Sequence, residues 1–226
     1  MKDKKKMILT IDGPAGAGKS SAGKLAAKRL NFTYLDTGAM YRAVALAVKE
    51  NNLNIEDEAE VSRLLPSLEI KLEEDKIFLN GVDVSSKIRL PEMDLLASAV
   101  SRLKCVRDFL GKLQRQIGEK GRIVAEGRDM GTVIFPDAAA KVFLTATPEV
   151  RAKRRLKQLE EKGIKADYQE LVKQIKERDI ADSTRDIAPL KPASDAMILD
   201  SSDKDLDTVV DIIVDFANKQ FEKVEH

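Results

Sequence analysis

The chain of 226 residues contains one cysteine, one histidine and no tryptophan. Because Cys105 is alone, an internal disulfide and a zinc site built from cysteines are excluded, and a reducing compartment is natural. The only histidine, His226, is the last residue and can be the remnant of an expression tag. Imidazole acid–base catalysis and histidine-ligated zinc are therefore outside the chemistry available to this chain.

Neither sign of charge dominates, since 39 Lys and Arg side chains face 38 Asp and Glu side chains. This balance gives no electrostatic reason to expect a nucleic-acid polymer or an acidic membrane as a partner. No apolar run approaches membrane-spanning length, and the apolar stretch after the basic residues 1–6 is too short for a signal peptide. We therefore expect a cytoplasmic globular protein.

Residues 13–20, GPAGAGKS, match the phosphate-loop pattern G-x-x-x-x-G-K-[ST] at every fixed position. An apolar run at 7–11 precedes them and helical spacing at 21–30 follows, which is the strand–loop–helix context that the motif needs. The alternative is a glycine-rich turn that only caps a strand, and pattern and context together argue against it. The loop offers backbone N–H groups and a lysine for phosphates, and a hydroxyl for Mg²⁺. It therefore predicts a nucleoside triphosphate site. The residues expected at this site are Gly13, Pro14, Ala15, Gly16, Ala17, Gly18, Lys19, Ser20 and Ser21.

Five short apolar strands separated by helical segments predict an α/β fold, with a five-stranded parallel sheet and helices on both faces. The strands are expected near residues 7–11, 32–35, 122–125, 141–146 and 196–199. Helices are expected at 21–30, 39–50, 56–66, 91–118 and 205–221, with Arg- and Lys-rich helices between 146 and 196. Residues 67–84 differ, because apolar residues alternate with polar ones around a turn at 73–75 and an Asn80-Gly81 hairpin signal. They predict a small inserted antiparallel sheet.

Glycines or carboxylates follow four of the predicted strands, at Gly13, 36–38, 126–129 and Asp200. Ligands of such folds bind beyond the carboxyl ends of the strands, so these residues should share one rim. Glu126 is the candidate acidic partner of Mg²⁺, through water, because carboxylate plus phosphate is the usual magnesium combination. The alternative role for Glu126 is to cap the turn that follows the strand.

Arginines form two helical patterns. Arg151, Arg154 and Arg155 stand at i, i+3 and i+4, and Arg178, Asp182 and Arg185 stand at i, i+4 and i+7. Together with Arg128 they can neutralise the charge that develops when a phosphoryl group moves between two phosphates. The alternative is that they form solvated helix faces tied by weak ion pairs. That alternative is weaker for Arg128, which follows a predicted buried strand.

The lack of any histidine before His226 also bears on which molecule accepts the phosphoryl group. A hydroxyl acceptor usually needs a carboxylate base, whereas a nucleoside monophosphate is already ionised near neutral pH. Asp36 or Asp129 could act as a base, so a small-molecule kinase with a hydroxyl acceptor remains open. A GTPase-type switch is a second alternative, but the Asn-Lys-x-Asp segment typical of guanine recognition is absent from the sequence. A purely structural protein would not need the phosphate loop.

These motifs together resemble bacterial cytidylate kinases over nearly the whole chain. The resemblance is carried by residues 11–20 (IDGPAGAGKS), 35–42 (LDTGAMYR), 126–136 (EGRDMGTVIFP) and 175–179 (IKERD), and by the following Asp182, Arg185 and 188–190 (APL). It implies ATP as phosphoryl donor, CMP or dCMP as acceptor, Mg²⁺ as cofactor and a monomeric enzyme. It also implies one catalytic domain, 1–226, with a monophosphate-binding region at about 38–105 that includes the extra sheet, and a mobile lid at about 151–168.

The resemblance further implies residue roles. The residues that read cytosine are matched by Ser98, Arg107 and Asp129, and those that hold the monophosphate are matched by Arg42, Arg128 and Arg178. The resemblance places Asp182 and Arg185 near the ribose. It places Tyr41 and Thr37 beside the nucleotide. Arg151, Arg154 and Arg155 belong to the lid over the donor phosphates, and the expected catalytic groups are Lys19, Arg128, Arg154 and Arg178. Glu126 stands where aspartate is familiar, which lengthens the reach of the carboxylate that we expect, with Ser20, at the metal. Thr37 stands where serine also occurs and keeps the hydroxyl.

Overall fold

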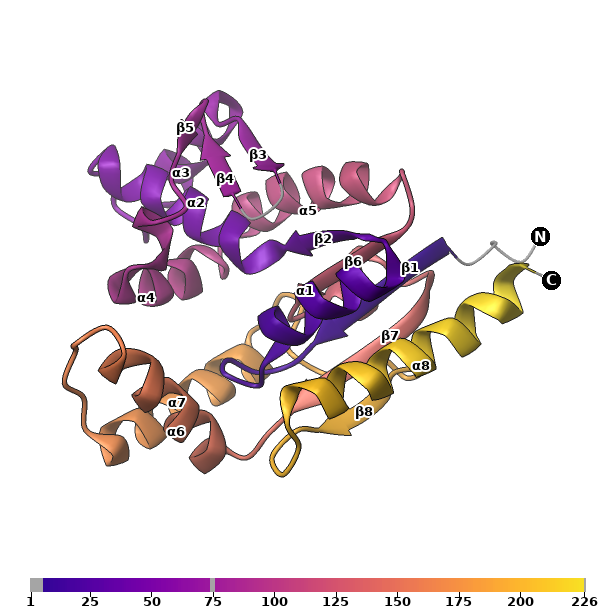
Figure 1. The fold of residues 1–226 in the computed structure, drawn as a ribbon. Helices are drawn as coiled ribbons and strands as arrows, with labels where there is room; N and C mark the ends of the chain where they lie inside the picture. The colour runs from indigo at the N-terminus through magenta and orange to yellow at the C-terminus, as the bar shows by residue number, and fades with distance from the viewer. Residues whose placement is uncertain (1–5, 74–75, 226) are drawn as a thin grey trace. The chain divides into compact units, whose positions relative to one another are not determined.

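The computed structural model describes residues 6–73 and 76–225. Residues 1–5, part of the predicted turn at 73–75, and His226 lie outside the described residues. The strands are β1 (Lys6–Asp12), β2 (Thr33–Asp36), β3 (Ile70–Glu73), β4 (Lys76–Leu79), β5 (Val82–Asp83), β6 (Ile123–Gly127), β7 (Ala138–Thr145) and β8 (Met197–Asp200) (Figure 1). The α-helices are α1 (Lys19–Leu30), α2 (Thr37–Glu50), α3 (Glu58–Leu64), α4 (Pro91–Val100), α5 (Lys104–Gly118), α6 (Pro148–Glu160), α7 (Tyr168–Thr184) and α8 (Leu206–Glu225).

A five-stranded parallel sheet has the order β2-β6-β1-β7-β8, which confirms the predicted fold class. The central strand β1 is a nearly continuous apolar run because neighbouring strands flank it on both sides and its residues are buried. Asp12, the last residue of β1, stands opposite Gly127 of β6 and Phe143 of β7. The ends of these three strands therefore meet at one rim.

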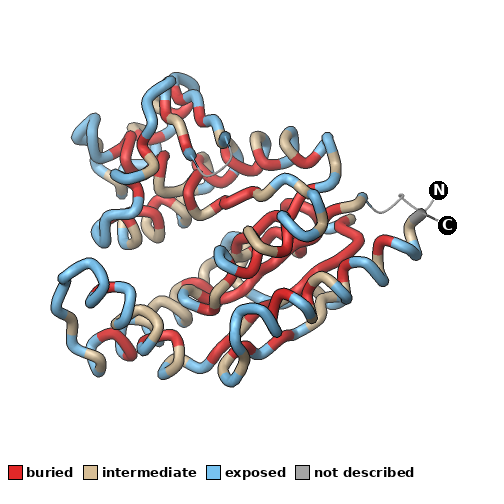
Figure 2. Tube along the Cα trace, in the orientation of Figure 1, coloured by how far each residue is buried: buried red, intermediate tan, exposed pale blue. Residues whose placement is uncertain are grey.

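Helices α1 and α8 pack together and contact β6 and β7 respectively. Figure 2 shows the buried residues concentrated along the strands and on the inner sides of these helices. Small side chains such as Ala22 and Ala26 let α1 approach the sheet, while Ile213 and Phe221 fill the space under α8. The apolar core of the sheet therefore lies directly behind the rim and supports it.

The chain divides into two compact units, one of residues 1–34 and 121–226 and one of residues 35–120. We call them unit 1 and unit 2, always for the residues that the structure describes. Unit 1 contains β1 and most of the parallel sheet, with α1, α6, α7 and α8. Unit 2 contains α2 to α5 and a three-stranded sheet in the order β3-β4-β5, with antiparallel pairing.

The inserted antiparallel sheet of unit 2 is the one that the sequence predicts. Asn80 and Gly81 both have positive φ, 49° and 78°, which is the backbone of a two-residue hairpin turn matched to the strand twist. The predicted helix at 56–66 is shorter, since α3 ends at Leu64 and a 3₁₀ turn, Leu65–Ser67, takes in Pro66.

The helical structure predicted at 91–118 is present, but it is divided into two helices. Helix α4 ends at Val100 and α5 begins at Lys104, because Leu103 has extended backbone, with φ −74° and ψ 125°. The break leaves the carbonyl of Ser101 without a continuing helix, and Arg107 Nη1 donates to it at 3.1 Å. Arg107, which is expected to read the base, therefore also satisfies a carbonyl at the break between the two helices.

None of the helices in the described part of the chain is both long enough and apolar enough to cross a bilayer.

A single π-helical turn, Met130–Ile134, is a second difference from the sequence-based expectation, and it directly follows Arg128 and Asp129. Such turns are rare and often occur at functional sites.

Candidate functional site

The phosphate loop joins β1 to α1 in unit 1. Gly13 has no room for a side chain, since an added Cβ would lie 1.9 Å from the carbonyl oxygen of Leu144. Gly18 is the N-cap of α1 with φ 95°, a left-handed conformation that favours glycine. Because glycine has no side chain with which to cap the helix, the N–H groups of the first turn are left for an anion. Ser20 and Ser21 follow on this turn and are exposed.

Lys19 is buried at the start of α1, and its Nζ donates to the carbonyl of Pro14 at 2.8 Å. Burial lowers the pKa of Lys19 to about 7, helped by the positive charge of Arg128 and opposed by Glu126. A bound phosphate would favour the charged lysine and reverse this effect. The buried position of Lys19 therefore favours binding of an anion.

Glu126, at the end of β6, is buried and accepts hydrogen bonds from two hydroxyls. Ser20 Oγ donates to Glu126 Oε1 at 2.7 Å, and the Tyr34 hydroxyl donates to the same oxygen at 2.8 Å. Hydroxyl, carboxylate and phosphate oxygens are hard ligands of the kind that Mg²⁺ prefers, so these residues fit a magnesium ion that a nucleotide brings. Tyr34 was not predicted, because a tyrosine within an apolar strand gives no signal of its own.

In residues 6–73 and 76–225 no three or more His, Cys, Asp or Glu side chains are grouped so that they could hold a metal ion. Magnesium commonly binds through one or two carboxylates plus substrate phosphates and waters.

Asp12 was also not predicted. Its carboxylate is buried at the end of β1 and accepts hydrogen bonds from the backbone N–H groups of Met130 at 2.8 Å and Gly131 at 2.7 Å. Burial raises the pKa of Asp12 to about 6, although the two hydrogen bonds act in the opposite direction. Asp12 thereby holds the π-helical turn, and with it the backbone that follows Arg128 and Asp129. An aspartate at the end of a buried strand is the signal that could have identified it.

The predicted group of Arg128, Arg178, Asp182 and Arg185 comes together in unit 1. Arg128 Nε donates to Asp182 Oδ2 at 3.1 Å, and Asp182 is 6% exposed. Burial acts to raise the pKa of Asp182, but Arg128, Arg178 and Arg185 outweigh it and hold the pKa below its ordinary value. Three guanidinium groups around one carboxylate leave a positive excess, which suits a phosphate.

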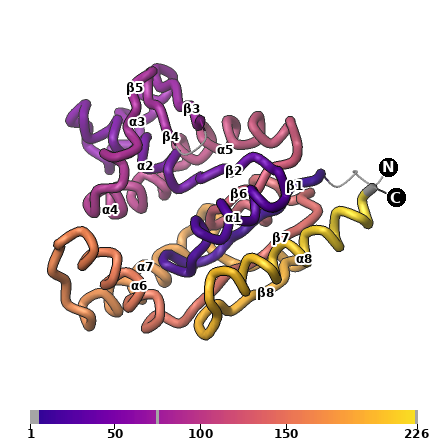
Figure 3. The backbone as a smooth tube through the Cα atoms, viewed as in Figure 1, coloured from indigo at the N-terminus to yellow at the C-terminus, as the bar shows by residue number. Residues whose placement is uncertain are grey.

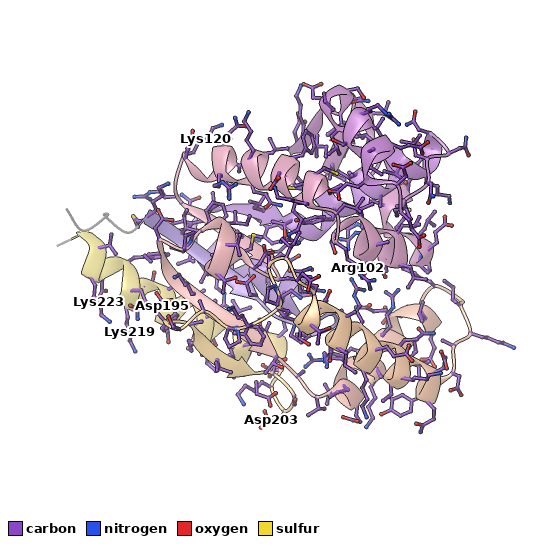
Figure 4. The ribbon with its side chains drawn as sticks, turned by 180° about the vertical axis from the view of Figure 1, so that it is seen from behind. Arg102, Lys120, Asp195, Asp203, Lys219 and Lys223 are labelled. Carbon is purple, nitrogen blue, oxygen red and sulfur yellow. The ribbon has the colours of Figure 1, made fainter. Side chains whose placement is uncertain are left out.

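Helix α6 carries the other predicted arginines. Arg154 Nη1 donates to the carbonyl of Ala17 in the phosphate loop at 3.3 Å, and Nη2 donates to the carbonyl of Ser201 at 2.7 Å. Ser201 lies on the loop after β8, where Figure 4 labels Asp203. Arg151 is 2% exposed, so it is not part of a solvated helix face, and Arg155 is half-buried.

Unit 2 contains five of the predicted substrate residues. Arg42 lies on α2 with Nη2 3.8 Å from Asp36 Oδ2 and Nη1 3.8 Å from Asp94 Oδ1. The guanidinium of Arg107 lies over the ring of Tyr41, 5.8 Å from its centroid. Thr37 begins α2 and is buried, and Ser98 is half-buried on α4. Asp129, the third residue predicted to read cytosine, belongs to unit 1 and is buried.

The comparisons with known proteins show the family of the chain. The family model described as "Cytidylate kinase" matches residues 9–219. A cytidylate kinase of Fusobacterium nucleatum is 45% identical over 219 residues, covering 97% of this chain and 99% of its own. A cytidylate kinase of Carboxydothermus hydrogenoformans is 46% identical over 218 residues, covering 95% of this chain and 98% of its own.

Among solved structures, a protein of Eubacterium ventriosum has a TM-score of 0.50 at 14% identity and covers 95% of this chain and 99% of its own; this likeness concerns the fold alone. The family match, in contrast, runs through both units and includes the phosphate loop, the π-helical turn and the arginine group. The chain therefore belongs to the cytidylate kinase family.

Proposed function

We propose that this chain is an enzyme that transfers the γ-phosphate of ATP to CMP or dCMP, giving ADP and CDP or dCDP in pyrimidine nucleotide metabolism. The observation that carries the proposal is the match to cytidylate kinases at 45% identity over 97% of the chain. Residues expected to bind donor and acceptor all lie inside the matched range, 9–219. The buried cationic groups of unit 1 supply the physical reason for a phosphate ligand.

The phosphate loop binds the donor in this proposal. Lys19 and backbone N–H groups of the loop at 13–21, in which Pro14 has none to donate, hold the β- and γ-phosphates, with Arg151 and Arg155 on α6 completing the donor side. Ser20 and Glu126 would hold Mg²⁺, which supplies neutralisation of the donor phosphates when bound. Closure of residues 151–168 over the donor excludes water and thereby limits ATP hydrolysis.

The acceptor phosphate is held by Arg42, Arg128 and Arg178. Its second pKa is about 6, so it is ionised near neutral pH and needs no general base. Lys19, Arg128, Arg154 and Arg178 neutralise the charge that builds up on the phosphoryl group in line between donor and acceptor. Asp182 orients Arg128 through the 3.1 Å hydrogen bond and, with Arg185, lies near the ribose in this assignment.

The pyrimidine is read by Ser98, Arg107 and Asp129, with Thr37 and Tyr41 beside the nucleotide. Cytosine presents an amino donor beside an acceptor, whereas uracil presents the reverse pattern. A carboxylate that accepts from the amino group and an arginine that donates to the acceptors would leave unpaired groups against uracil. We also propose that the enzyme acts as a cytoplasmic monomer without nucleic-acid or membrane partners. The near-zero net charge supports the absence of nucleic-acid and acidic-membrane partners.

A phosphoryl-transfer assay with ATP and a panel of nucleoside monophosphates tests the proposal, with Lys19→Ala as the inactive control. We expect CMP and dCMP to be the preferred acceptors and GTP to be a poorer donor than ATP. The same assay includes sugars and alcohols. Transfer to one of these in preference to every monophosphate would overturn the proposal and support a kinase with a hydroxyl acceptor.

A further inference from the structure

Two ion pairs join α6 to α7, which run side by side in unit 1 (Figure 3). Arg151 pairs with Asp179, with Nη1 to Oδ1 at 2.9 Å and Nη2 to Oδ2 at 2.5 Å. Lys176 pairs with Glu149 at 3.3 Å. The side chain of Arg151 is 3% exposed, whereas those of Lys176 and Glu149 are 54% and 52% exposed. The side chain of Asp179 is 30% exposed, so the two pairs connect the same helices and the Arg151–Asp179 pair is the more buried of the two.

The buried pair is also attached to the phosphate loop. Arg151 Nη1 donates to the carbonyl of Ala15 at 3.2 Å, and Arg151 Nε donates to the carbonyl of Ala146 at 2.8 Å. An added Cβ at Gly16 would lie 3.2 Å from Cβ of Arg151, so the loop packs closely against this side chain. The guanidinium therefore connects the loop, the segment before α6, and α7.

Asp179 determines which way the guanidinium points. By accepting from both Nη atoms, it fixes the plane of the fork and leaves one Nη1 hydrogen for Ala15. A loop carbonyl that is held by an arginine cannot rotate toward bound phosphates, where it would repel them. Loss of Asp179 would also leave a buried guanidinium without its compensating charge, which makes reorientation of Arg151 favourable.

We propose that Asp179 is a positioning residue for the phosphates of the nucleoside triphosphate: it holds Arg151 against Ala15 and so maintains the anion-binding conformation of the loop. Asp179 does not touch the donor itself. The inference rests on the proposed function only in that the loop binds a nucleoside triphosphate. Because α7 follows the predicted lid, the same contact links the position of α7 to donor binding.

The test compares Asp179→Asn with Lys176→Ala, which breaks the exposed pair between the same two helices. Binding of ADP and of ATP is measured by calorimetric titration without an acceptor, so no turnover is needed. We expect Asp179→Asn to raise the Kd of both nucleotides about tenfold, which equals about 1.4 kcal/mol. Lys176→Ala should change the Kd less than twofold, and Asp179→Glu should recover part of the lost affinity.

Steady-state kinetics then separate positioning from general loss of structure. Asp179→Asn should raise KM for ATP while KM for CMP stays unchanged, and the circular dichroism spectrum should match that of the wild type. Unchanged nucleotide affinity in Asp179→Asn would overturn the proposal, as would equal weakening in Lys176→Ala. If Asp179→Asn unfolds, Asp179→Glu decides instead, because it keeps the charge but displaces the carboxylate from the fork of Arg151 and should also weaken ADP binding, though less.

The outcome is separable from that of the proposed function. A chain that phosphorylates no monophosphate but loses ATP affinity in Asp179→Asn would keep this inference and overturn the acceptor assignment. A chain that phosphorylates CMP normally, with wild-type KM for ATP in Asp179→Asn, would do the reverse.

Discussion

Arg42 of unit 2 is held differently from Arg128 and Arg151 of unit 1. In unit 1, Arg151 is buried and paired with Asp179 at 2.5 and 2.9 Å, and Arg128 is bonded to a buried Asp182 at 3.1 Å. In unit 2, Arg42 stands 3.8 Å from each of two carboxylates, Asp36 and Asp94. Contacts of 3.8 Å are longer than charge-assisted hydrogen bonds, which lie near 2.7–2.9 Å.

The difference indicates a division of labour. Arg151 and Arg128 of unit 1 are already fixed by protein groups, so the proposed binding of phosphates there would need little reorganisation. Arg42 of unit 2 is balanced between two acceptors that hold it loosely, so a phosphate can replace them at small cost. We therefore expect substitutions at Lys19 and Arg151 of unit 1 to affect the donor or the chemical step, and substitutions at Arg42 of unit 2 to affect the acceptor.

The largest effect is expected from Lys19→Ala. Loss of a charged donor at the transferring phosphates should lower kcat by about 10²–10³-fold, comparable to removal of one donor from an oxyanion site. Lys28→Ala, on the exposed side of the same helix, serves as the matched control and should keep wild-type kcat. Measurement of kcat with saturating ATP and CMP decides, and a loss of less than tenfold would remove Lys19 from the chemical step.

Arg42→Ala should act on the acceptor alone. Loss of hydrogen bonds to a charged phosphate is worth about 1.5–3 kcal/mol, which predicts a rise in KM for CMP of about 10–100-fold. KM for ATP should stay within twofold of the wild type. Lys49→Ala is the control, since Lys49 lies on the same helix and forms an exposed pair with Glu92. An equal rise in both KM values would contradict the division between the units.

Asp129→Ala tests where that division stops, because Asp129 belongs to unit 1 but is expected to read the acceptor base. A lost contact to the cytosine amino group should lower the ratio of kcat/KM for CMP to that for UMP about tenfold. Asp203→Ala, in the exposed loop labelled in Figure 4, should leave this ratio unchanged. If the ratio in Asp129→Ala equals that of the wild type, Asp129 does not read the base.

The fold was predictable because apolar runs and helical spacing are local signals. The parallel sheet, the Asn80-Gly81 hairpin and the phosphate loop all depend on short stretches whose conformation is set by nearby residues. The break at Leu103 was not predictable, because the apolar stripe continues across it and the compensating contact comes from Arg107, six residues after the released carbonyl.

The site was predictable where a motif names its chemistry and not where a residue acts through another. Lys19 and Ser20 belong to a pattern, and Arg128 with Asp182 followed from strand ends and helical spacing. Asp12 and Asp179 each bind groups distant in sequence, at separations of 118 and 28 residues. Such contacts depend on tertiary structure, so periodicity alone cannot identify them.

The smallest effect is expected in the pH dependence of stability. It tests whether the buried carboxylate of Asp12 in unit 1 lowers the free energy of unfolding. The pKa of Asp12 is raised from 3.8 to about 6, chiefly by burial, so the folded chain holds this proton more tightly than the unfolded chain. Folding therefore becomes less favourable as pH rises from 4 to 6, and the whole penalty remains above that range. Urea unfolding should show that wild type loses roughly 1 kcal/mol relative to Asp12→Asn between pH 5 and pH 7. Asp200→Asn is the control: hydrogen bonds from Ser202 lower the pKa of exposed Asp200, so its titration lies below pH 5 and the difference from wild type should stay flat. A flat difference for Asp12→Asn as well would mean that Asp12 is ionised in the folded chain without penalty.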